Sequence, residues 1–231
     1  MEKNKINVDS FKTTLTDNNP LFLEIDSNTK LDITVMEGVN SKLIIVGNKN
    51  YDISVKLEKE SSLTVNSLNK DNSVNVGITL LENSNINYNH STLSSIDSVN
   101  NFKVNHESNS SVSNINNNGI NRTDNKLFFN IDGVIPKNLK EIVCNQSSKI
   151  INFNNGNSKI IPNLIVDSND IIANHAAYIG EISEEELFYM QSRGIKLEDI
   201  KRLVYKGVLL GKMDLDEEKE EFNKIINEWW W

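Results

Sequence analysis

Four side chains in this sequence are of the kinds that bind metals or act as nucleophiles: His90, His106, His175 and the single cysteine, Cys144. The histidines are far apart, and none belongs to a local metal motif such as two histidines four positions apart on a helix. A single cysteine excludes an internal disulfide and a cysteine-pair site for zinc or a cluster. Any metal cluster handled here must therefore take ligands from other chains.

The same four side chains also have a structural interpretation. Cys144 follows Ile142 and Val143, and an apolar setting is typical of a buried, inert thiol. An isolated histidine is more often structural or exposed than a ligand. In a fold made of stacked coils, however, histidines that are distant in sequence can come together. The sequence alone leaves both interpretations open.

Other catalytic signatures are absent or weak. Gly180, Gly194, Gly207 and Gly211 are isolated and form no phosphate-binding loop, and no nucleophile elbow is present. A pair of carboxylates of the glycosidase type remains open, although solvated turn acids are the favoured interpretation. The acids concerned are Asp97, Glu107, Asp124 and Asp132. We predict that the chain is not itself an enzyme.

Charge and hydropathy exclude two classes of partner. The formal net charge is -8 and no basic patch is evident, so we expect no nucleic-acid binding. Residues 1–7 lack the apolar core of a signal peptide, and no stretch approaches the roughly 20 apolar residues of a membrane span. We therefore expect a cytoplasmic protein without a membrane partner.

Short alternating apolar pairs recur along the first two thirds of the sequence and are separated by Asn, Ser, Gly, Lys and Asp. Alternation of this kind predicts strands with one buried face, and the polar residues between them predict turns. The pairs are Leu31/Ile33/Val35, Leu43/Ile45, Ile53/Val55, Leu63/Val65, Val74/Val76 and Ile86/Tyr88. Evenly spaced short strands are typical of a sandwich, a barrel or a solenoid.

Two observations favour the solenoid, with two strands in each coil of about 20 residues. We place Asn66, Asn75 and Asn87 at repeated turn positions, where Asn tolerates left-handed backbone and can form ladders. Hairpin signals are scarce: Asn-Gly and Asp-Gly occur only at 118–119, 132–133 and 155–156. Consecutive strands are therefore not expected to pair as hairpins. The abundance of Asn has an alternative explanation in the nucleotide composition of the source genome.

The composition changes at Glu181, where Glu, Leu and Lys replace Asn and Ser. We therefore divide the chain into a strand body, residues 1–180, and a helical region, residues 181–231. Ser183 and Glu186 form a capping box for a first helix, which Gly194 is expected to end. A second helix is predicted over 197–205, with Gly207 closing it.

A third helix is predicted to start at Asp214. Its apolar positions are Phe222, Ile225, Ile226 and Trp229, which share one helical face. Residues 229–231 are three consecutive tryptophans, and their rings are costly to expose. Burial against the body and contact with a partner protein explain them equally well.

Several motifs resemble those of one protein family. Residues 174–180 (NHAAYIG) and 183–195 (SEEELFYMQSRGI) are similar to the signature of the SufB/SufD proteins of the SUF system for iron–sulfur cluster assembly. In that family, a His-Gly-Ala-type segment precedes a Leu-Phe-Tyr-Leu-x-Ser-Arg-Gly run. Residues 102–106 (FKVNH), 128–133 (FFNIDG) and 162–166 (PNLIV) resemble the family's β-helix core. The likeness extends from about residue 90 to 212.

The resemblance implies a mainly β fold, a right-handed parallel β-helix with a C-terminal helical subdomain. It implies that these helices dock a SufC-like ABC ATPase and that the β-helix pairs with a SufB/SufD-type subunit or a second copy of the chain. No intrinsic cofactor is implied, but a transient iron–sulfur cluster or iron is handled at the subunit interface. His175 matches the family's interface histidine, and His106 and Cys144 are further candidates. The candidate docking residues are Leu187, Phe188, Tyr189, Arg193, Gly194, Leu203 and Gly207.

The departures from the family pattern favour a SufD-like or shortened, divergent member. SufB proteins have a functional cysteine a few residues after the position of Pro162, whereas the sequence near Val166 has none. They also carry an acid after the matching histidine, where this chain has Ala176. Strand-like repeats begin almost at once, so we expect the family's N-terminal helical region to be missing.

The leading functional hypothesis is therefore a scaffold subunit of iron–sulfur cluster assembly. One alternative is a divergent β-helix homodimer that only binds partner proteins and has lost cluster chemistry. A less favoured alternative is a carbohydrate-active β-helix, which would need a carboxylate or basic cluster along an outer face.

Overall fold

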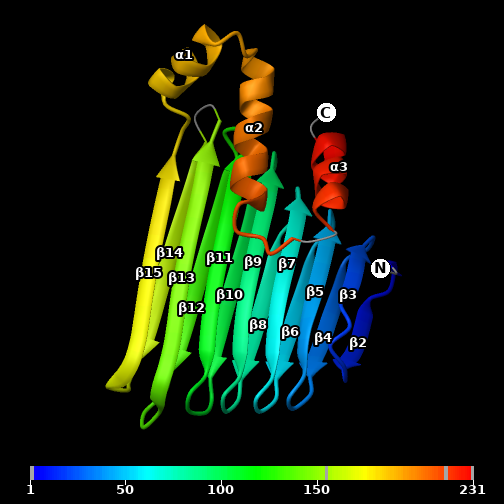
Figure 1. Cartoon of the computed structure of the whole chain (residues 1–231), viewed down its shortest axis with the longest axis vertical. Coiled ribbons are helices and arrows are strands. Elements are labelled where there is room, and N and C mark those ends of the chain that lie inside the picture. Colours follow the sequence, from blue (N-terminus) through cyan, green and yellow to red (C-terminus); the bar gives the residue numbers. More distant parts are fainter. Residues whose placement is uncertain (1–2, 154–155, 216–217, 230–231) are drawn as a thin grey trace.

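The computed structural model describes residues 3–153, 156–215 and 218–229. Within these residues, fifteen strands are followed by three helices (Figure 1). The strands are β1 (Lys3–Ile6), β2 (Ser10–Leu15), β3 (Leu21–Ile25), β4 (Thr29–Val35), β5 (Asn40–Gly47), β6 (Tyr51–Leu57), β7 (Ser62–Lys70), β8 (Val74–Leu80), β9 (Asn85–Ser94), β10 (Ser98–His106), β11 (Val112–Asn121), β12 (Lys126–Ile135), β13 (Lys140–Asn152), β14 (Asn157–Val166) and β15 (Asp170–Gly180). The helices are α1 (Glu184–Ser192), α2 (Leu197–Leu210) and α3 (Lys219–Trp229).

The strands form two sheets, and neighbouring strands within each sheet run parallel. One sheet, here called the odd sheet, has the order β1-β3-β5-β7-β9-β11-β13-β15, and the even sheet has the order β14-β12-β10-β8-β6-β4-β2. Each coil therefore contributes one strand to each sheet, which confirms the predicted parallel β-solenoid. Lys3 pairs with Phe22 and Ser113 pairs with Cys144, so the coil length increases from 19 to 31 residues between these positions. The predicted coil length is too short for the later coils.

Inward-facing apolar side chains form the core between the two sheets. All six apolar pairs predicted as strands lie on β4 to β9, and every one of their members is buried. In β6 the alternation is complete, with Tyr51, Ile53, Val55 and Leu57 buried and the residues between them exposed. Strict period-two burial is what a strand needs when one of its faces is packed. The alternation in the sequence therefore predicted the core correctly.

The Asn residues form ladders, but not at the predicted places. Asn66, Asn75 and Asn87 lie within β7, β8 and β9, so their assignment to turns was wrong. Asn75 donates to Asp52 at 2.7 Å and accepts from Asn101 at 2.8 Å. In-register parallel coils place equivalent side chains one strand spacing apart, which suits amide-to-amide hydrogen bonds. Ladder formation itself is confirmed.

Helices α2 and α3 cover the outer face of the odd sheet, as Figure 1 shows. An apolar stripe crosses that face from β3 to β13, one residue or two from each odd strand. Its buried members are Phe22, Ile44, Val46, Leu68, Leu93, Ile120 and Ile151. Tyr205 and Leu209 of α2 and Phe222 and Ile226 of α3 are buried against this stripe. The helices are amphipathic because one face must cover apolar sheet surface.

The helix ends agree with the predictions in part. Ser183 caps α1 and makes the reciprocal bonds of a capping box with Glu186, and Gly194 has a positive φ of 82° just beyond the helix. Gly207 was expected to end the second helix but lies inside α2, which continues to Leu210. The third helix begins at Lys219 and not at Asp214. Packing on the sheet extends α2 past Gly207, because burial in the tertiary structure outweighs the low helix propensity of glycine.

The predicted apolar face of the third helix is correct. Phe222 and Ile226 are buried, and Ile225 and Trp229 are half-buried against the same cluster. Trp229 is therefore packed on the body, while Trp230 and Trp231 lie outside the described residues. No helix within the described ranges has the length and apolar character needed to cross a membrane.

Candidate functional site

Two of the predicted site residues, His106 and Cys144, meet inside the solenoid through a serine that joins them. His106 ends β10, and its Nε2 lies 3.0 Å from the Ser113 hydroxyl on β11. Ser113 also hydrogen-bonds to Cys144, its in-register partner on β13. His106 Nδ1 lies 2.7 Å from the Ser111 hydroxyl. Three consecutive coils therefore contribute to one buried chain of hydrogen bonds.

The donor and acceptor roles in this network of hydrogen bonds can be assigned by starting from Ser111. Ser111 donates its only hydroxyl proton to the backbone carbonyl of Ser108, at 3.1 Å. Nδ1–H of His106 must then donate to Ser111, so Nε2 accepts from Ser113. This assignment satisfies both ring nitrogens of a neutral imidazole.

Burial also favours the neutral form of both groups. Desolvation raises the pKa of the Cys144 thiol and lowers the pKa of His106 to about 4. A catalytic cysteine requires the opposite, a thiolate stabilised by a nearby cation. The site therefore suits a structural or masked thiol and not an activated nucleophile.

Gly133 makes the space in which Cys144 sits. A Cβ added at Gly133 would lie 2.7 Å from the Cys144 Sγ and 3.0 Å from the Gln146 Nε2. Both distances are below ordinary van der Waals contact. The Asp132-Gly133 pair, which resembles a hairpin signal, is thus part of a strand whose glycine is needed for packing.

His175, the third predicted site residue, lies at the end of the solenoid. It is exposed on β15, the last strand of the odd sheet, and pairs in register with Gln146, two residues along β13 from Cys144. Parallel register and period-two alternation put His175 on the same sheet face as Cys144. His175 therefore lies next to the coil that contains Cys144, at the C-terminal end of the solenoid.

The last coil carries an unusual amount of exposed apolar surface. Ile172, Tyr178 and Ile179 of β15 and Ile165 and Val166 of β14 are exposed, with Ile172 at 59%. The positions equivalent to Ile179 and Val166 are buried in the preceding coil, where Ile150 and Ile135 occupy them. The positions equivalent to Ile172 and Tyr178 are more open there too, since Val143 is half-buried and Lys149 is exposed. Contiguous exposed apolar surface of this kind is typical of a protein interface.

His90 is a core residue and lies apart from the other histidines. It is fully buried on β9, its Nδ1 faces the Asn69 amide at 3.3 Å, and its ring makes an edge contact with Phe102 at 5.1 Å. Burial lowers the pKa of His90 to about 3. His90 thus has the structural role that was one of the two interpretations left open.

The predicted docking residues gather on α1 and the adjoining part of α2. None of the side chains described for α1 is buried, and Phe188 is 74% exposed. Tyr189 is also exposed, and the Arg193 guanidinium stacks on its ring at 5.2 Å. Leu187 is half-buried. Phe188, Tyr189 and Arg193 thus form a solvent-facing surface, while Leu187 is partly covered within the described chain.

Leu203 and Gly207 extend that surface along α2. Leu203 is 57% exposed and Gly207 is exposed one helical turn further on. The opposite face of α2 carries Tyr205 and Leu209, which are buried against the sheet. Helix α2 therefore has one face committed to the sheet and another that is apolar and free of the sheet.

The four candidate carboxylates do not form a common cluster. Asp97 and Asp124 lie between strands, whereas Asp132, expected in a turn, lies within β12 and accepts from Asn163 at 2.8 Å. Across residues 3–153, 156–215 and 218–229, no three His, Cys, Asp or Glu side chains are grouped so that they could hold a metal ion.

The comparison with known families identifies the chain's relatives. The SufBD core domain of the SUF system for FeS cluster assembly matches residues 23–208. The chain belongs to the SufBD family. The matched region runs from β3 into the last turn of α2 and leaves out β1, β2 and α3.

Curated SufBD relatives are similar over short stretches only. The SufD iron–sulfur cluster assembly protein of Bacillus subtilis is 34% identical over 68 residues, 28% of this chain and 16% of SufD. A SufBD family protein of Mycobacterium bovis is 34% identical over 70 residues, 29% of this chain and 18% of that protein. A Mycobacterium leprae relative is 42% identical over 48 residues, 20% of this chain and 12% of its own length. The matches thus span less than a fifth of these relatives.

Sequence reasoning missed the serines that connect the site of this SufBD chain. Ser111 and Ser113 carry no motif, and only the coil register places Ser113 between His106 and Cys144. A signal was available in the repeat: once the coil length near β11 is known, residues 113 and 144 align. Gly133 could be recognised only from the packing.

We predict that His106 makes the stability of this SufBD chain depend on pH. Its pKa of about 4 lies below that of a histidine in the unfolded chain, about 6.5. The unfolded state therefore binds more protons between these values. The stabilisation that comes from neutral His106 is fully present when the pH is above the higher pKa. It is lost as the pH falls towards the lower pKa, and the free energy of unfolding then decreases by up to about 1.4 kcal/mol per pH unit.

Urea unfolding between about pH 6.5 and 4.5 measures this dependence. His106→Asn should reduce the slope, and the part that remains comes from His90, whose pKa is also lowered by burial. Ser111→Ala is the matched control, because it removes the 2.7 Å bond but keeps the titrating ring, and should lower stability without flattening the slope. Equal slopes for wild type and His106→Asn would contradict the prediction.

Proposed function

We propose that this chain is a non-catalytic scaffold subunit of cytoplasmic iron–sulfur cluster assembly. In this proposal, α1 and the exposed face of α2 dock a SufC-type ABC ATPase. The open end of the solenoid pairs with a SufB/SufD-type subunit or a second copy. Residues 1–180 form the body and residues 181–231 the docking region.

The exposed apolar surface of α1 and α2 is the observation that carries the proposal. Phe188, Tyr189 and Leu203 are large apolar side chains more than half exposed, on helices that belong to a well-packed fold. The capping box at Ser183 and the positive φ at Gly194 hold α1 in one orientation. A pre-ordered aromatic surface with an arginine is the composition expected of a binding hot spot.

Truncation of this surface should abolish most of the ATPase binding. Phe188→Ala and Arg193→Ala should each weaken binding of the SufC-type ATPase of the same organism about tenfold or more, because the aromatic anchor or its stacking partner is lost. Pull-down and calorimetric titration measure the effect.

Two control variants make this test specific. Met36→Ala removes an apolar side chain that is 43% exposed between β4 and β5, and Lys212→Ala removes an exposed cation after α2. Both should bind as wild type does. Undiminished capture by Phe188→Ala and Arg193→Ala would rule out this docking surface.

The uncovered last coil supports the proposed pairing. Strands β14 and β15 are the terminal strands of their sheets, so each has one edge without a strand partner. An unpaired edge next to exposed apolar side chains readily accepts another chain. The N-terminal end is less suitable, because β1 has only four residues.

A charge placed on the last coil should prevent pairing. Ile172→Lys puts an ammonium on the proposed interface, where burying an unpaired charge is costly. Light scattering after gel filtration should give twice the mass of one chain, or a complex with a SufB-type subunit, for wild type and a single chain for the variant. Val8→Lys, at an exposed position between β1 and β2, is the matched control and should pair normally. A wild-type chain that stays single in both settings would contradict the pairing.

His175 is the residue we propose for handling iron or a cluster as cargo. It is exposed at the open end, where a second subunit can supply the remaining ligands. Cys144 and His106 are more remote candidates, because both are buried and already hydrogen-bonded through Ser113. Imidazole nitrogen is a suitable ligand for iron.

Anaerobic reconstitution with iron and sulfide tests this role. The paired complex should develop cluster absorbance, and His175→Ala should lower its yield. His106→Ala, one of the buried alternatives, should lower it less. A yield that is the same with and without His175 would support the second candidate function, a scaffold that binds partners without cluster chemistry.

A further inference from the structure

The two ends of helix α2 are held very differently. Its first turn and α1 project past the ends of the strands, whereas its last turn lies over the middle of the odd sheet (Figure 1). At that inner end, the Ser91 hydroxyl donates to the Leu209 carbonyl at 2.6 Å. The inner end of α2 is therefore tied to β9, while the outer end carries the proposed docking surface.

The segment after α2 is fastened to the sheet by a pair of hydrogen bonds that use one backbone unit. The Asn66 amide donates to the Asp214 carbonyl at 2.6 Å and accepts from the Asp214 N–H at 3.3 Å. Asn66 is fully buried on β7, and Met213 and Leu215, on either side of Asp214, pack in the helix–sheet cluster. The side-chain amide thus binds the linker as a strand neighbour would.

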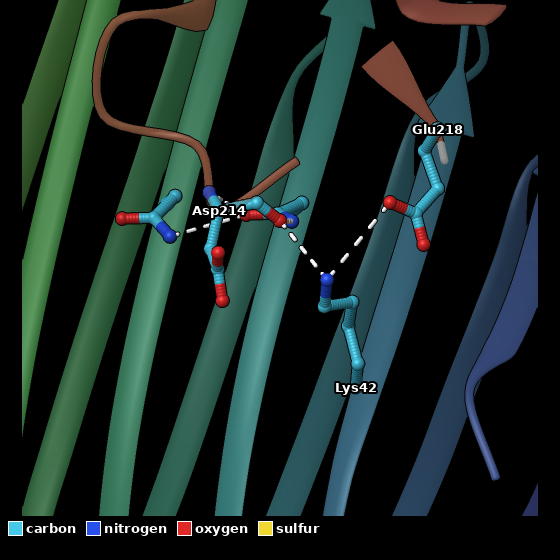
Figure 2. Close-up of polar contacts among 5 residues, drawn as sticks. Lys42, Asp214 and Glu218 are labelled. Atoms are coloured by element: carbon cyan, nitrogen blue, oxygen red, sulfur yellow. Dashed lines mark hydrogen bonds and ion pairs between the residues drawn. The ribbon is translucent and has the colours of Figure 1, made fainter. Parts of the chain in front are cut away.

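Lys42 joins the same point to the start of α3. Its Nζ donates to the Asp214 carbonyl at 3.2 Å and lies 3.9 Å from a Glu218 carboxylate oxygen (Figure 2). The side chains of Lys42 and Glu218 are only 18% and 10% exposed. Partial burial reduces solvent screening, so this ion pair holds its geometry better than a surface pair would. We call Lys42, Asn66, Asp214 and Glu218 the linker clamp.

The linker clamp continues into a ladder of amides across neighbouring coils. Asn89 on β9 donates to Asn66 at 3.1 Å, and Asn116 on β11 donates to Asn89 at 3.0 Å. These residues occupy equivalent positions on successive strands of the odd sheet. A displacement of Asp214 must therefore either move β7 with its neighbours β9 and β11 or break partly buried hydrogen bonds.

We infer that the linker clamp passes movement of the docking helices to the coils of the solenoid. This inference rests on the proposed function, because the movement comes from the ATPase bound to α1 and α2. When nucleotide binding shifts that ATPase, the rigid helix α2 transmits the shift to its inner end. Asn66 and Lys42 are positioning residues that link this end to β7, β9 and β11.

Hydrogen exchange in the complex with the SufC-type ATPase tests the inference. Wild type should show a difference between the ATP-bound and nucleotide-free complexes over β9 and β11, residues 85–94 and 112–121. Asn66→Ala and Lys42→Met should bind the ATPase as wild type does but reduce that difference about twofold or more. A merely structural role would change exchange equally in both nucleotide states.

Matched controls come from the even sheet. Asn75→Ala removes a ladder amide, and Lys56→Met removes a lysine paired with Glu58 at 2.7 Å. Neither contacts the clamp, and both should keep the nucleotide-dependent difference at its wild-type size. Lys42→Met retains the apolar stem of the side chain, so it remains informative if Asn66→Ala destabilises the fold.

The outcomes separate this inference from the proposed function. If wild type does not bind the ATPase, the docking proposal and this inference both fail. If the ATPase binds but wild type shows no nucleotide-dependent difference over β9 and β11, the inference alone is overturned. It is also overturned if both clamp variants keep the wild-type difference.

Discussion

Each strand of this protein makes its backbone hydrogen bonds with the strands one coil before and one coil after it. A strand in the middle of the stack is satisfied on both edges, and its inward side chains are covered by the next coil. The coil formed by β14 and β15 has a neighbour on one side only. Exposure of His175 and Ile179 follows from this constraint, since their register partners Gln146 and Ile150 in the preceding coil are buried. The last coil is thus the part of the described solenoid where inward-facing side chains remain uncovered.

The three helices differ in how much they cover the outer face of the odd sheet. An apolar stripe crosses the strands and needs cover, and α3 and the inner half of α2 supply it. Helix α1 contributes no fully buried side chain among those described, and only Leu187 and Met190 are partly covered. Its exposed aromatic side chains therefore add little to the stability of the fold, which is the property of a surface available for contact.

The interior favours neutral groups throughout. His90 and His106 lose basicity on burial, and burial likewise makes the Cys144 thiol harder to ionise. A medium of low dielectric constant penalises charge unless a counter-charge is present. Chemistry that needs charged or metal-binding side chains is therefore better suited to the solvated end of the solenoid, where His175 lies. This physical reason separates His175 from the two buried candidates.

The sequence by itself determined most of the architecture, whereas only the tertiary structure decided which residues meet. Period-two alternation predicted β4 to β9 with their buried residues, and local rules predicted the capping box at Ser183 and the turn at Gly194, because these features depend on neighbours in the chain. The end of α2 beyond Gly207 and the start of α3 at Lys219 were missed because packing on the sheet overrides weak helix propensities. The chain from His106 through Ser113 to Cys144 and the linker clamp at Asn66 were also out of reach. Both depend on coil register, because coil length varies from 19 to 31 residues and no local sequence pattern specifies it.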